Sequence, residues 1–364
     1  MAAPLTALAD AVSARVLAAL DERTNRFSDV GEALPDLLEP ARSLLGGGKR
    51  LRAQLCGAGW AAAGKTLSVD DPVVLAGSAL ELFQGAALVH DDVMDDSSTR
   101  RGKPAAHRHF AAAHRERGWL GGPGEHGQAA AIVLGDLLLA LSAMELDAAT
   151  SLTPPSAGGR GRHIYDEMIA EVALGQYLDV RSQALPWGAR TPGGRNAVDL
   201  ALQVVCHKSA RYSVEHPLVL GAALAGAEDG LLDALRAVGL PLGEAFQLRD
   251  DELGVFGDPS VTGKPAGDDL REGKRTVLLA MTVERADASG RELVRELVGA
   301  PDLDAEGVAA LQQLMRSTGA LAEHEVFIDD RYAAGLSALE SADVPRHAQD
   351  LVRGLAAALV RRTA

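Results

Sequence analysis

The chain lacks the residues that would build a disulfide-stapled or sheet-rich protein. Only two cysteines occur, Cys56 and Cys206, and both lie among apolar residues, so we expect buried, reduced thiols. Aromatic residues make up only 4% of the sequence, while alanine, leucine and valine are abundant. This composition favours packed helices and offers little material for a large sheet. The length of 364 residues is enough to bury a sizeable core.

Basic residues are fewer than acidic ones. The sequence has 36 lysines and arginines and 50 aspartates and glutamates, which gives a formal net charge of −14. A general affinity for nucleic acid needs a basic face, so we expect no nucleic-acid partner. No N-terminal stretch combines a basic region, an apolar region and a cleavage site. No apolar run of about 20 residues is free of charges. We therefore expect a cytoplasmic protein with no membrane span.

Helical periodicity dominates the pattern of apolar residues. From Leu5 to Leu20 they recur every three or four positions, which predicts an opening helix over Leu5–Arg23. The same reasoning predicts further helices over Lys49 to Ala63, Pro72 to Asp95, 128–150, 162–183, 196–225 with a break near Pro217, 229–256, 273–288, 302–318, 321–341 and 345–362.

Stretches rich in glycine or proline separate these segments, and we predict loops at Gly118–Gly127, Ser151–Arg162 and Pro186–Gly194. None is long or polar enough to indicate a linker between domains. Strand-like alternation and fixed-period repeats are both missing from the sequence. The simplest expectation is one all-helical domain over residues 1–364.

The first acidic cluster ends an apolar helical segment. Asp91 and Asp95 are four residues apart and share a helix face, with Asp92 to one side. Like charges at the C-terminal end of a helix are unfavourable, so they need compensating cations. A basic turn follows directly at residues 97–104. Carboxylates that hold Mg²⁺ beside arginines that bind phosphate oxygens are what a metal–diphosphate complex requires.

A second acidic cluster repeats this arrangement later in the chain. Gln247, Asp250 and Asp251 end another predicted helix, and Lys264 and Lys274 follow on turn-rich segments. Either cluster alone could be a solvated helix end. Together, each followed by basic residues, they predict two units that could face each other across the cavity of a helical bundle.

These motifs, in this order and spacing, resemble those of the trans-prenyl diphosphate synthase family, which includes the farnesyl and geranylgeranyl diphosphate synthases. The resemblance runs from about Gly47 to Thr276 and implies an all-α, single-domain isoprenoid-synthase bundle around a central cavity, and a homodimer. The motifs that carry it are residues 47–52, Asp91-Asp92 with Asp95, Arg100-Arg101, Gln176 with Asp179, Lys208-Ser209 (Ser in place of Thr), Gln247 with Asp250-Asp251, and Lys264 with Lys274.

The resemblance implies a Mg²⁺-dependent prenyltransferase that joins an allylic diphosphate to isopentenyl diphosphate by ionisation, condensation and elimination. It implies three Mg²⁺, two on Asp91 and Asp95 and one on Asp250. The implied catalytic residues are Asp91, Asp92, Asp95, Arg100, Lys208, Asp250, Asp251 and Lys264. The implied binding residues are Lys49, Arg52, Arg101 and Gln84 for isopentenyl diphosphate, and Arg100, Lys208 and Lys264 around the allylic diphosphate. Further substrate-binding residues implied by the resemblance are Ser209, Gln247 and Lys274.

The length of the product is predicted from the helix that precedes the first acidic cluster. Ala87 and Ala86 lie four and five residues before Asp91, and Phe83 lies eight before it. One helix turn rises about 5.4 Å, roughly one isoprene unit. The small residues leave room for more than fifteen carbons, and Phe83 would form the floor for twenty. We therefore predict geranylgeranyl diphosphate, unless Phe83 packs in the core and other helices set the length.

One residue departs from the family pattern. The second motif ordinarily has a third aspartate, and Gly254 stands in its place. The resemblance assigns most of the metal binding there to the first aspartate, so we expect a modest effect. Asp258, Asp268 and Asp269 are candidates for help from outside the motif.

Other functions fit parts of the pattern. A class I terpene cyclase shares the helical fold and an aspartate-rich motif, but it needs no site for isopentenyl diphosphate such as residues 47–52 would form. A non-catalytic regulatory subunit of a prenyl diphosphate synthase is a second alternative, although such subunits tend to lose a whole motif. A helical scaffold with fortuitous acidic ends is the third.

Overall fold

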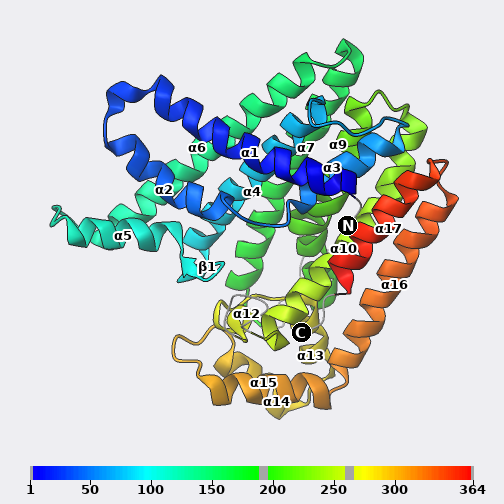
Figure 1. Cartoon of the computed structure of the whole chain (residues 1–364). Helices are drawn as coiled ribbons and strands as arrows, with labels where there is room; N and C mark the ends of the chain where they lie inside the picture. Colours follow the sequence, from blue (N-terminus) through cyan, green and yellow to red (C-terminus); the bar gives the residue numbers. More distant parts are fainter. Residues whose placement is uncertain (1–2, 188–195, 259–265, 362–364) are drawn as a thin grey trace. The chain divides into compact units, whose positions relative to one another are not determined.

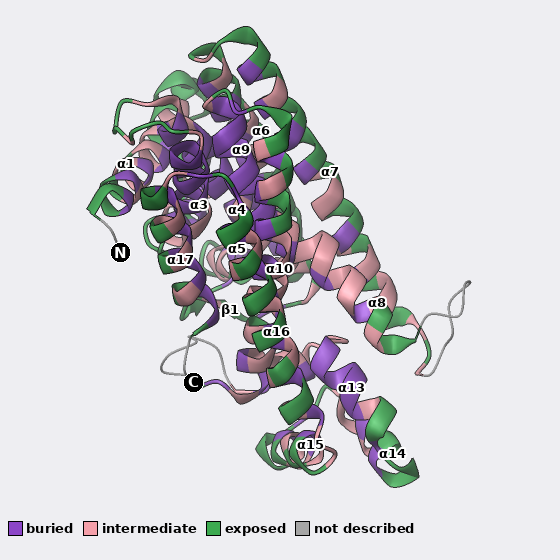
Figure 2. Ribbon diagram, turned by 90° about the vertical axis from the view of Figure 1, so that its right-hand side faces the viewer, coloured by how far each residue is buried: buried purple, intermediate pink, exposed green. Residues whose placement is uncertain are grey.

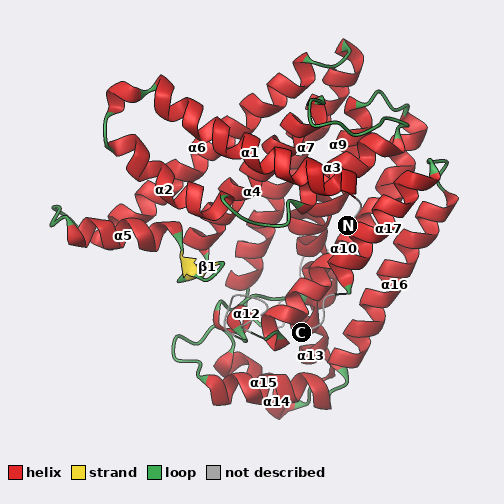
Figure 3. Ribbon diagram, viewed as in Figure 1, coloured by secondary structure: helices red, strands yellow, loops and turns green. Residues whose placement is uncertain are grey.

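The structure is a computed structural model that describes residues 3–187, 196–258 and 266–361. Most of this part of the chain is helical (Figure 3), which confirms the predicted all-α class. The strands within these residues are β1 (Thr99–Arg100) and β2 (Lys103–Pro104), which form one short antiparallel pair. Sequence patterns do not reveal this pair, because two residues are too few for a strand pattern.

Contacts within the chain group its residues into two compact units. Unit 1 comprises residues 1–163, 217–228 and 344–351, and unit 2 comprises residues 164–216, 229–343 and 352–364. Helices α7 (Pro155–Ala184), α9 (His216–Leu224) and α17 (Arg346–Val360) each have residues in both units. The single domain expected from the sequence stays a prediction, and each unit is described by itself.

Unit 1 is built around helix α4 (Pro72–Met94), which packs against α6, α3 and α1. Its residues are mostly buried (purple in Figure 2), including Leu80, Leu82 and Ala86. The remaining elements of unit 1 in the described residues are α1 (Ala3–Arg26), η1 (Ser28–Val30), α2 (Ala33–Leu45), α3 (Leu51–Ala62), α5 (Ala106–Glu116) and α6 (Pro123–Ser151), all labelled in Figure 1 except η1.

Unit 2 is built around helix α10 (Asp229–Phe256), which packs against α16 and against an unusual helix, η2 (Val205–Glu215). Helix η2 is a π-helix, a form that is rare and frequent at functional sites. The other elements of unit 2 are α8 (Ala197–Val204), α12 (Asp268–Arg271), α13 (Val277–Arg285), α14 (Ala288–Leu297), α15 (Ala305–Ser317) and α16 (Ala320–Ser341).

Two of the predicted loops are partly helical. Helix α6 begins at Pro123, inside the predicted loop Gly118–Gly127, and α7 begins at Pro155, inside the predicted loop Ser151–Arg162. Proline is favoured in the first turn of a helix, so each of these prolines starts a helix within a stretch that was predicted to be a loop. The third predicted loop lies mostly outside the described residues. The expected break near Pro217 is where the π-helix gives way to α9.

Both cysteines are free thiols, as expected. Burial raises the pKa of the Cys56 thiol to about 12, while Cys206 is only half-buried. Helices α1, α4 and α6 are long and apolar enough to cross a membrane by length and composition, although 72% of the apolar window of α4 is buried inside the fold. The absence of a membrane span therefore stays a prediction from the sequence.

Candidate active site

The first acidic cluster lies in the last turn of α4. Asp91 and Asp95 are both partly exposed there, and Asp95 caps the helix by donating its backbone N–H to the Asp91 carbonyl at 2.8 Å. Asp92 points to another side and is buried, with 2% of its surface exposed. This is the division that the helical spacing predicted, with two carboxylates on one face and a third beside them.

The hairpin β1–β2 brings arginines back to this helix end. Its loop residues Arg101 and Gly102 both have positive φ, 53° and 73°, the combination typical of a tight two-residue hairpin turn. Arg100 donates from Nε and Nη2 to Asp92 Oδ1, at 2.9 and 2.5 Å, and its Nη2 lies 3.9 Å from Asp91 Oδ2. Arg100 is therefore one of the compensating cations that a carboxylate-rich helix terminus requires.

The second arginine of the hairpin holds the glycine-rich loop between α2 and α3. Arg101 Nη1 donates to the carbonyl oxygens of Leu44 and Gly47, at 2.8 and 2.9 Å. Gly48 has φ of 120°, and a Cβ there would lie 3.1 Å from Arg101 Nη1, so a residue with a side chain would be strained and crowded. Lys103 adds a hydrogen bond from Nζ to Ser43 Oγ at 2.9 Å.

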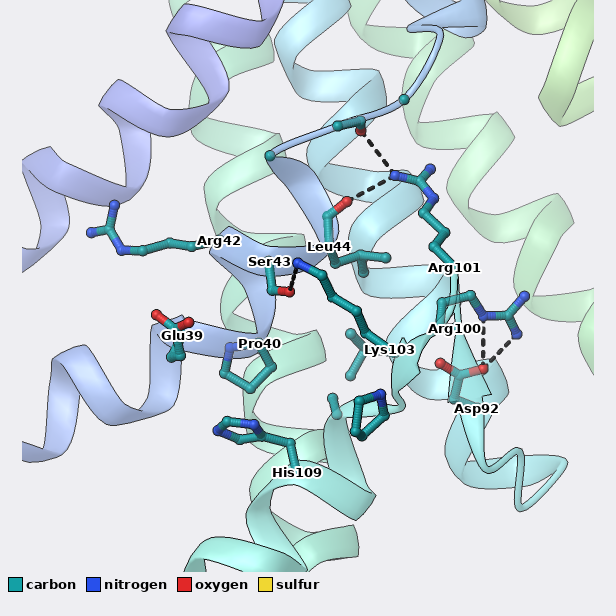
Figure 4. A pocket seen from close by; sticks show the side chains of 16 residues that line it. Glu39, Pro40, Arg42, Ser43, Leu44, Asp92, Arg100, Arg101, Lys103 and His109 are labelled. Carbon is teal, nitrogen blue, oxygen red and sulfur yellow. Dashed lines mark hydrogen bonds and ion pairs between the residues drawn. The ribbon is translucent and has the colours of Figure 1, made fainter. Parts of the chain in front are cut away.

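These residues line a cavity of about 540 Å³ within unit 1 (Figure 4). Its wall combines backbone of the glycine-rich loop with the side chains of Asp92, Arg100, Arg101 and Lys103. Arginines and a lysine on a concave surface offer the kind of donors that bind the oxygens of an anion. The lining residues are Glu39, Pro40, Arg42, Ser43, Leu44, Gly46, Gly47, Gly48, Val89, Asp92, Arg100, Arg101, Lys103, Pro104, Ala106 and His109.

The cavity brings only some of the predicted binding residues together. Arg100 and Arg101 both line it, although the resemblance assigned them to different substrates. Lys49, Arg52 and Gln84 are not among the lining residues of this cavity. Sequence reasoning missed Arg42, Lys103 and His109 as members of the wall. Lys103 belongs to the basic turn, which was the one signal that could have found it.

Arg50, the unassigned arginine of the first basic motif, is a structural residue. Only 3% of it is exposed, and its Nη1 lies 3.4 Å from Glu81 Oε2 on α4. It also donates to the carbonyl of Leu45 and adopts a left-handed conformation, with φ of 50°. Among the residues the structure describes, positive φ outside glycine occurs at Arg50, Asp96 and Arg101. All three flank the cavity or the acidic helix end, and such strain often collects at functional sites.

The second acidic cluster lies near the end of α10 in unit 2. Asp250 is exposed, whereas Asp251 is buried and accepts a hydrogen bond from Gln247 Nε2 at 2.7 Å. Burial raises the pKa of the Asp251 carboxyl well above its ordinary value, and the charges of Asp269 and Asp250 raise it further. Lys274 faces the same group of carboxylates, with Nζ 3.7 Å from Asp269 Oδ1 and 2.6 Å from Glu272 Oε2.

The predicted Lys208 lies on the π-helix and packs against one face of α7. This face carries a stripe of residues spaced four apart, namely Glu171, Gly175 and Asp179. Lys208 Nζ donates to Asp179 Oδ2 at 2.5 Å. One turn earlier, a Cβ at Gly175 would lie 2.3 Å from the Lys208 backbone nitrogen, so only glycine lets the two helices approach this closely. Gln176 and Ser209, the other predicted residues here, are both half-buried.

Glu171, one further turn along this stripe, joins three cationic or titratable partners. Its carboxylate oxygens lie 2.6 Å from His207 Nδ1, 3.0 Å from Arg211 Nη1 and 2.8 Å from His216 Nε2. Burial raises the pKa of this carboxyl, but the hydrogen bonds from His216 and His207 and the charge of Arg211 outweigh it and lower the pKa to about 2. Glu171 therefore fastens both ends of the π-helix to α7.

We expect Glu171→Gln to lower the free energy of unfolding at pH 7 by about 1–3 kcal/mol, because three donors lose a charged acceptor. The pKa of the native carboxyl lies below its ordinary value of 4.5, so the stabilisation is present above that value and is lost as the pH falls towards 2. Urea unfolding at pH 7 and pH 3 should show the difference from wild type shrinking in acid. Glu167→Gln, an exposed site one turn earlier, is the control, and an equal effect there would contradict the assignment.

The donor set fits a hard divalent cation. Both acidic clusters offer carboxylate oxygens on helix ends, with Asp91, Asp95 and Asp250 partly or fully exposed. No group of three or more His, Cys, Asp or Glu residues is clustered for metal binding among the described residues. Mg²⁺ does not require one, because it commonly binds one or two carboxylates and completes its shell with water and substrate phosphates.

Some predicted roles stay predictions. Lys264 lies outside the described residues. Phe83 and Ala86 are buried in α4 and Ala87 is half-buried, which fits either a tunnel wall or ordinary core packing. Lys274 lies beside Asp269 in unit 2, and its role in substrate binding stays a prediction.

Comparison with known proteins identifies the family. The polyprenyl synthetase family model matches residues 35–315. A geranylgeranyl diphosphate synthase of Mycobacterium tuberculosis is 31% identical over 295 residues, which is 81% of this chain and 75% of the relative. A geranylfarnesyl diphosphate synthase of Aeropyrum pernix is 31% identical over 297 residues, 79% of this chain and 82% of the relative.

A solved structure agrees with these sequence matches. Geranylgeranyl pyrophosphate synthase of Corynebacterium glutamicum, in complex with isoprenyl diphosphate and magnesium, has a TM-score of 0.90 and 37% identity, with 98% of this chain and 99% of that chain covered. The fold and these matches therefore define a prenyltransferase of the isoprenoid-synthase fold. The chain belongs to the polyprenyl synthetase family and is a trans-prenyl diphosphate synthase that acts on isoprenyl diphosphates, in a family that uses Mg²⁺.

Proposed function

We propose that this enzyme condenses isopentenyl diphosphate with an allylic diphosphate and releases geranylgeranyl diphosphate as its main product. The observation that carries the proposal is the cavity of about 540 Å³ in unit 1, where Arg100, Arg101 and the glycine-rich loop lie beside the acidic end of α4. A terpene cyclase needs no such second anion site, and a regulatory subunit has no need to keep both acidic clusters.

Each side chain then has a stated role. Asp91, Asp95 and Asp250 would hold three Mg²⁺, which would supply Lewis-acid neutralisation of the departing diphosphate. Fixed positive charge around the allylic diphosphate comes from Arg100, Lys208 and Lys264. Further contacts to substrate come from Ser209, Gln247 and Lys274. Asp92 orients Arg100 through the two hydrogen bonds it accepts.

The second substrate is bound without metal. Lys49, Arg52 and Arg101 hold the diphosphate of isopentenyl diphosphate, and Gln84 provides a neutral donor. Arg101 is already fixed by the carbonyls of Leu44 and Gly47, so little conformational entropy is lost when it binds an anion. Diphosphate released from the allylic substrate takes up the proton that leaves in the last step.

The decisive experiment is product analysis of the purified protein with Mg²⁺, isopentenyl diphosphate and each allylic primer in turn. Chain growth from the five-, ten- or fifteen-carbon primer supports the synthase. Release of a hydrocarbon without consumption of isopentenyl diphosphate would support the cyclase, and no turnover by the folded protein alone would support the regulatory subunit.

The argument for the product length comes from Phe83 more than from the similarity to relatives. Two relatives of equal identity, 31%, are a geranylgeranyl and a geranylfarnesyl diphosphate synthase, so overall similarity does not decide between twenty and twenty-five carbons. The buried phenyl ring of Phe83 and the small Ala86 one turn nearer to Asp91 support a floor at twenty carbons.

We therefore expect Phe83→Ala to lengthen the product to twenty-five carbons or more, because removal of the ring opens the wall by one further turn. Chromatography of the dephosphorylated products measures this. Phe110→Ala is the matched control, because it deletes a second buried phenyl ring of unit 1 at a similar packing cost, about 3–5 kcal/mol. An unchanged product from Phe83→Ala would refute the floor.

We also propose a cytoplasmic homodimer. The family resemblance supports the dimer. Sedimentation of the purified protein as a pure monomer at micromolar concentration would contradict the dimer.

A further inference from the structure

The winding of the π-helix η2 decides where the side chain of Lys208 points. The helix runs for 11 residues, whereas most π-helical segments are single-turn bulges. Its hydrogen bonds close five residues apart in place of four, so the chain turns through fewer degrees per residue than in an α-helix. A return to α-helical winding would therefore rotate Lys208 about the helix axis. The rarer winding needs contacts from outside the helix to hold it.

Glu171 on α7 supplies such contacts along the length of this helix. Its carboxylate oxygens lie 2.6 Å from His207 Nδ1, 3.0 Å from Arg211 Nη1 and 2.8 Å from His216 Nε2. His207 directly precedes Lys208, and His216 is the first residue after the π-helix. Only 13% of the Glu171 side chain is exposed, so protein groups satisfy most of its charge. One carboxylate thus ties three points of the segment to a single point on α7.

Arg211 has a second partner, and that partner favours the other winding. Arg211 Nε lies 3.6 Å from Oε2 of Glu215, which is four residues further on and only 7% exposed. Oppositely charged residues four apart face each other on an α-helix. Glu171 competes with this pair, because it accepts a hydrogen bond from Arg211 Nη1. Loss of the Glu171 charge would therefore leave Arg211 with the partner that suits α-helical winding.

The same face of α7 holds Lys208 at two further points. Gly175 lets the backbones approach, since a Cβ there would lie 2.3 Å from the Lys208 backbone nitrogen. Asp179 accepts a hydrogen bond from Lys208 Nζ at 2.5 Å. Glu171, Gly175 and Asp179 follow one another at the spacing that gives one face of a helix. Glu171 acts on Lys208 through the π-helix, because it bonds to the preceding residue, His207.

We propose that Glu171 is a positioning residue for Lys208: it holds the winding of the π-helix and so keeps the Lys208 ammonium where an allylic diphosphate binds. The inference rests on the proposed function, which gives Lys208 its diphosphate partner. In this role Glu171 touches no substrate. Without its charge, only a fraction of the molecules present Lys208 correctly, and the affinity falls with that fraction. The loss therefore cannot exceed the contribution of Lys208 itself.

The test is a double-mutant cycle on binding, measured without turnover. Calorimetry follows the binding of geranyl S-thiolodiphosphate, an allylic analogue whose carbon–sulfur bond resists ionisation, in the presence of Mg²⁺. We expect Lys208→Ala to raise Kd about tenfold or more, as for the loss of a hydrogen bond between charged groups. Glu171→Gln should raise Kd about fivefold. The double variant should bind no more weakly than Lys208→Ala alone.

Two controls separate positioning from a general loss of stability. Glu167→Gln removes an exposed carboxylate one turn earlier on α7 and should bind like the wild type. Val294→Ala removes part of a fully buried side chain on α14, so it lowers stability but should keep the wild-type Kd. If Glu171→Gln does not fold, His207→Ala takes its place in the cycle, because it removes only the contact beside Lys208.

The proposal is overturned if folded Glu171→Gln keeps the wild-type Kd. It is also overturned if this substitution weakens binding in the Lys208→Ala protein as much as in the wild type, because Glu171 would then act independently of Lys208. Absence of analogue binding by the wild-type protein would overturn it as well. Failure of the wild-type protein to elongate any primer would instead remove the proposed function. The two failures are distinguishable, because the binding experiment requires no turnover.

Discussion

Asp91→Asn is expected to lower kcat for condensation about 10²–10³-fold, with a smaller change in KM. The substitution keeps the size and the helix, but it removes the charge with which the carboxylate holds Mg²⁺. Neutralisation of the leaving diphosphate matters most as the carbon–oxygen bond breaks, so the loss falls on the transition state. Steady-state kinetics at saturating and limiting Mg²⁺ measure the effect.

Asp96→Asn is a close control for this variant. Asp96 follows the motif, is largely exposed and pairs with Arg108 Nη2 at 2.8 Å. Its φ is 52°, a conformation that asparagine accepts readily, so the backbone should not change. We expect activity close to wild type. An Asp91→Asn enzyme within about threefold of wild type would contradict the metal assignment.

The acidic helix end was predictable because helical spacing acts locally. Residues four apart share a face, so the sequence alone assigns Asp91 and Asp95 to one side of α4 and Asp92 to another. The hydrogen bond between Arg100 and the buried Asp92 was harder to predict. Arg100 returns through a hairpin of two-residue strands, and such short strands leave no pattern in the sequence.

Glycine contributed to the errors at two predicted loops. Gly127 falls in a predicted loop, yet it lies in α6, where a Cβ would be 2.3 Å from the His107 carbonyl oxygen. Gly161 likewise lies in α7, and a Cβ there would be 2.5 Å from Leu224 Cδ2. These glycines allow helices to approach closely. The sequence cannot separate that use from a turn, because the contact comes from a distant segment.

The π-helix is a second feature that sequence reasoning could not supply. The predicted helix 196–225 was correct in its helical character, but a change of hydrogen-bond pattern over Val205–Glu215 leaves no distinct spacing of apolar residues. Its neighbours show what holds it. Gly243 allows α10 to pack closely against the π-helix, since a Cβ there would lie 2.2 Å from the Ala210 carbonyl oxygen. Lys208 owes its place to this packing.

The closest helix approach in unit 1 yields the largest stability prediction. A Cβ at Gly59 on α3 would lie 1.8 Å from the Leu218 carbonyl oxygen, and a Cβ at Gly221 on α9 would lie 1.8 Å from the Cys56 carbonyl oxygen. Both obstacles are backbone atoms, which cannot rotate away. Relief therefore requires the two helices to move apart along their whole contact, in a region where Ala58, Leu218 and Ala222 are fully buried.

Gly59→Ala is thus expected to lower the free energy of unfolding by about 3 kcal/mol or more, at the upper end of what overpacking a core costs. The gain of roughly 0.5–1 kcal/mol that alanine ordinarily brings to a helix is too small to compensate. Gly159→Ala on α7 is the control, because a Cβ there meets nothing within 4 Å, and it should equal or exceed wild type. Urea unfolding of the three proteins measures the order. If Gly59→Ala were as stable as Gly159→Ala, the close packing of α3 on α9 would be wrong, and so would the position of the glycine-rich loop that leads into α3.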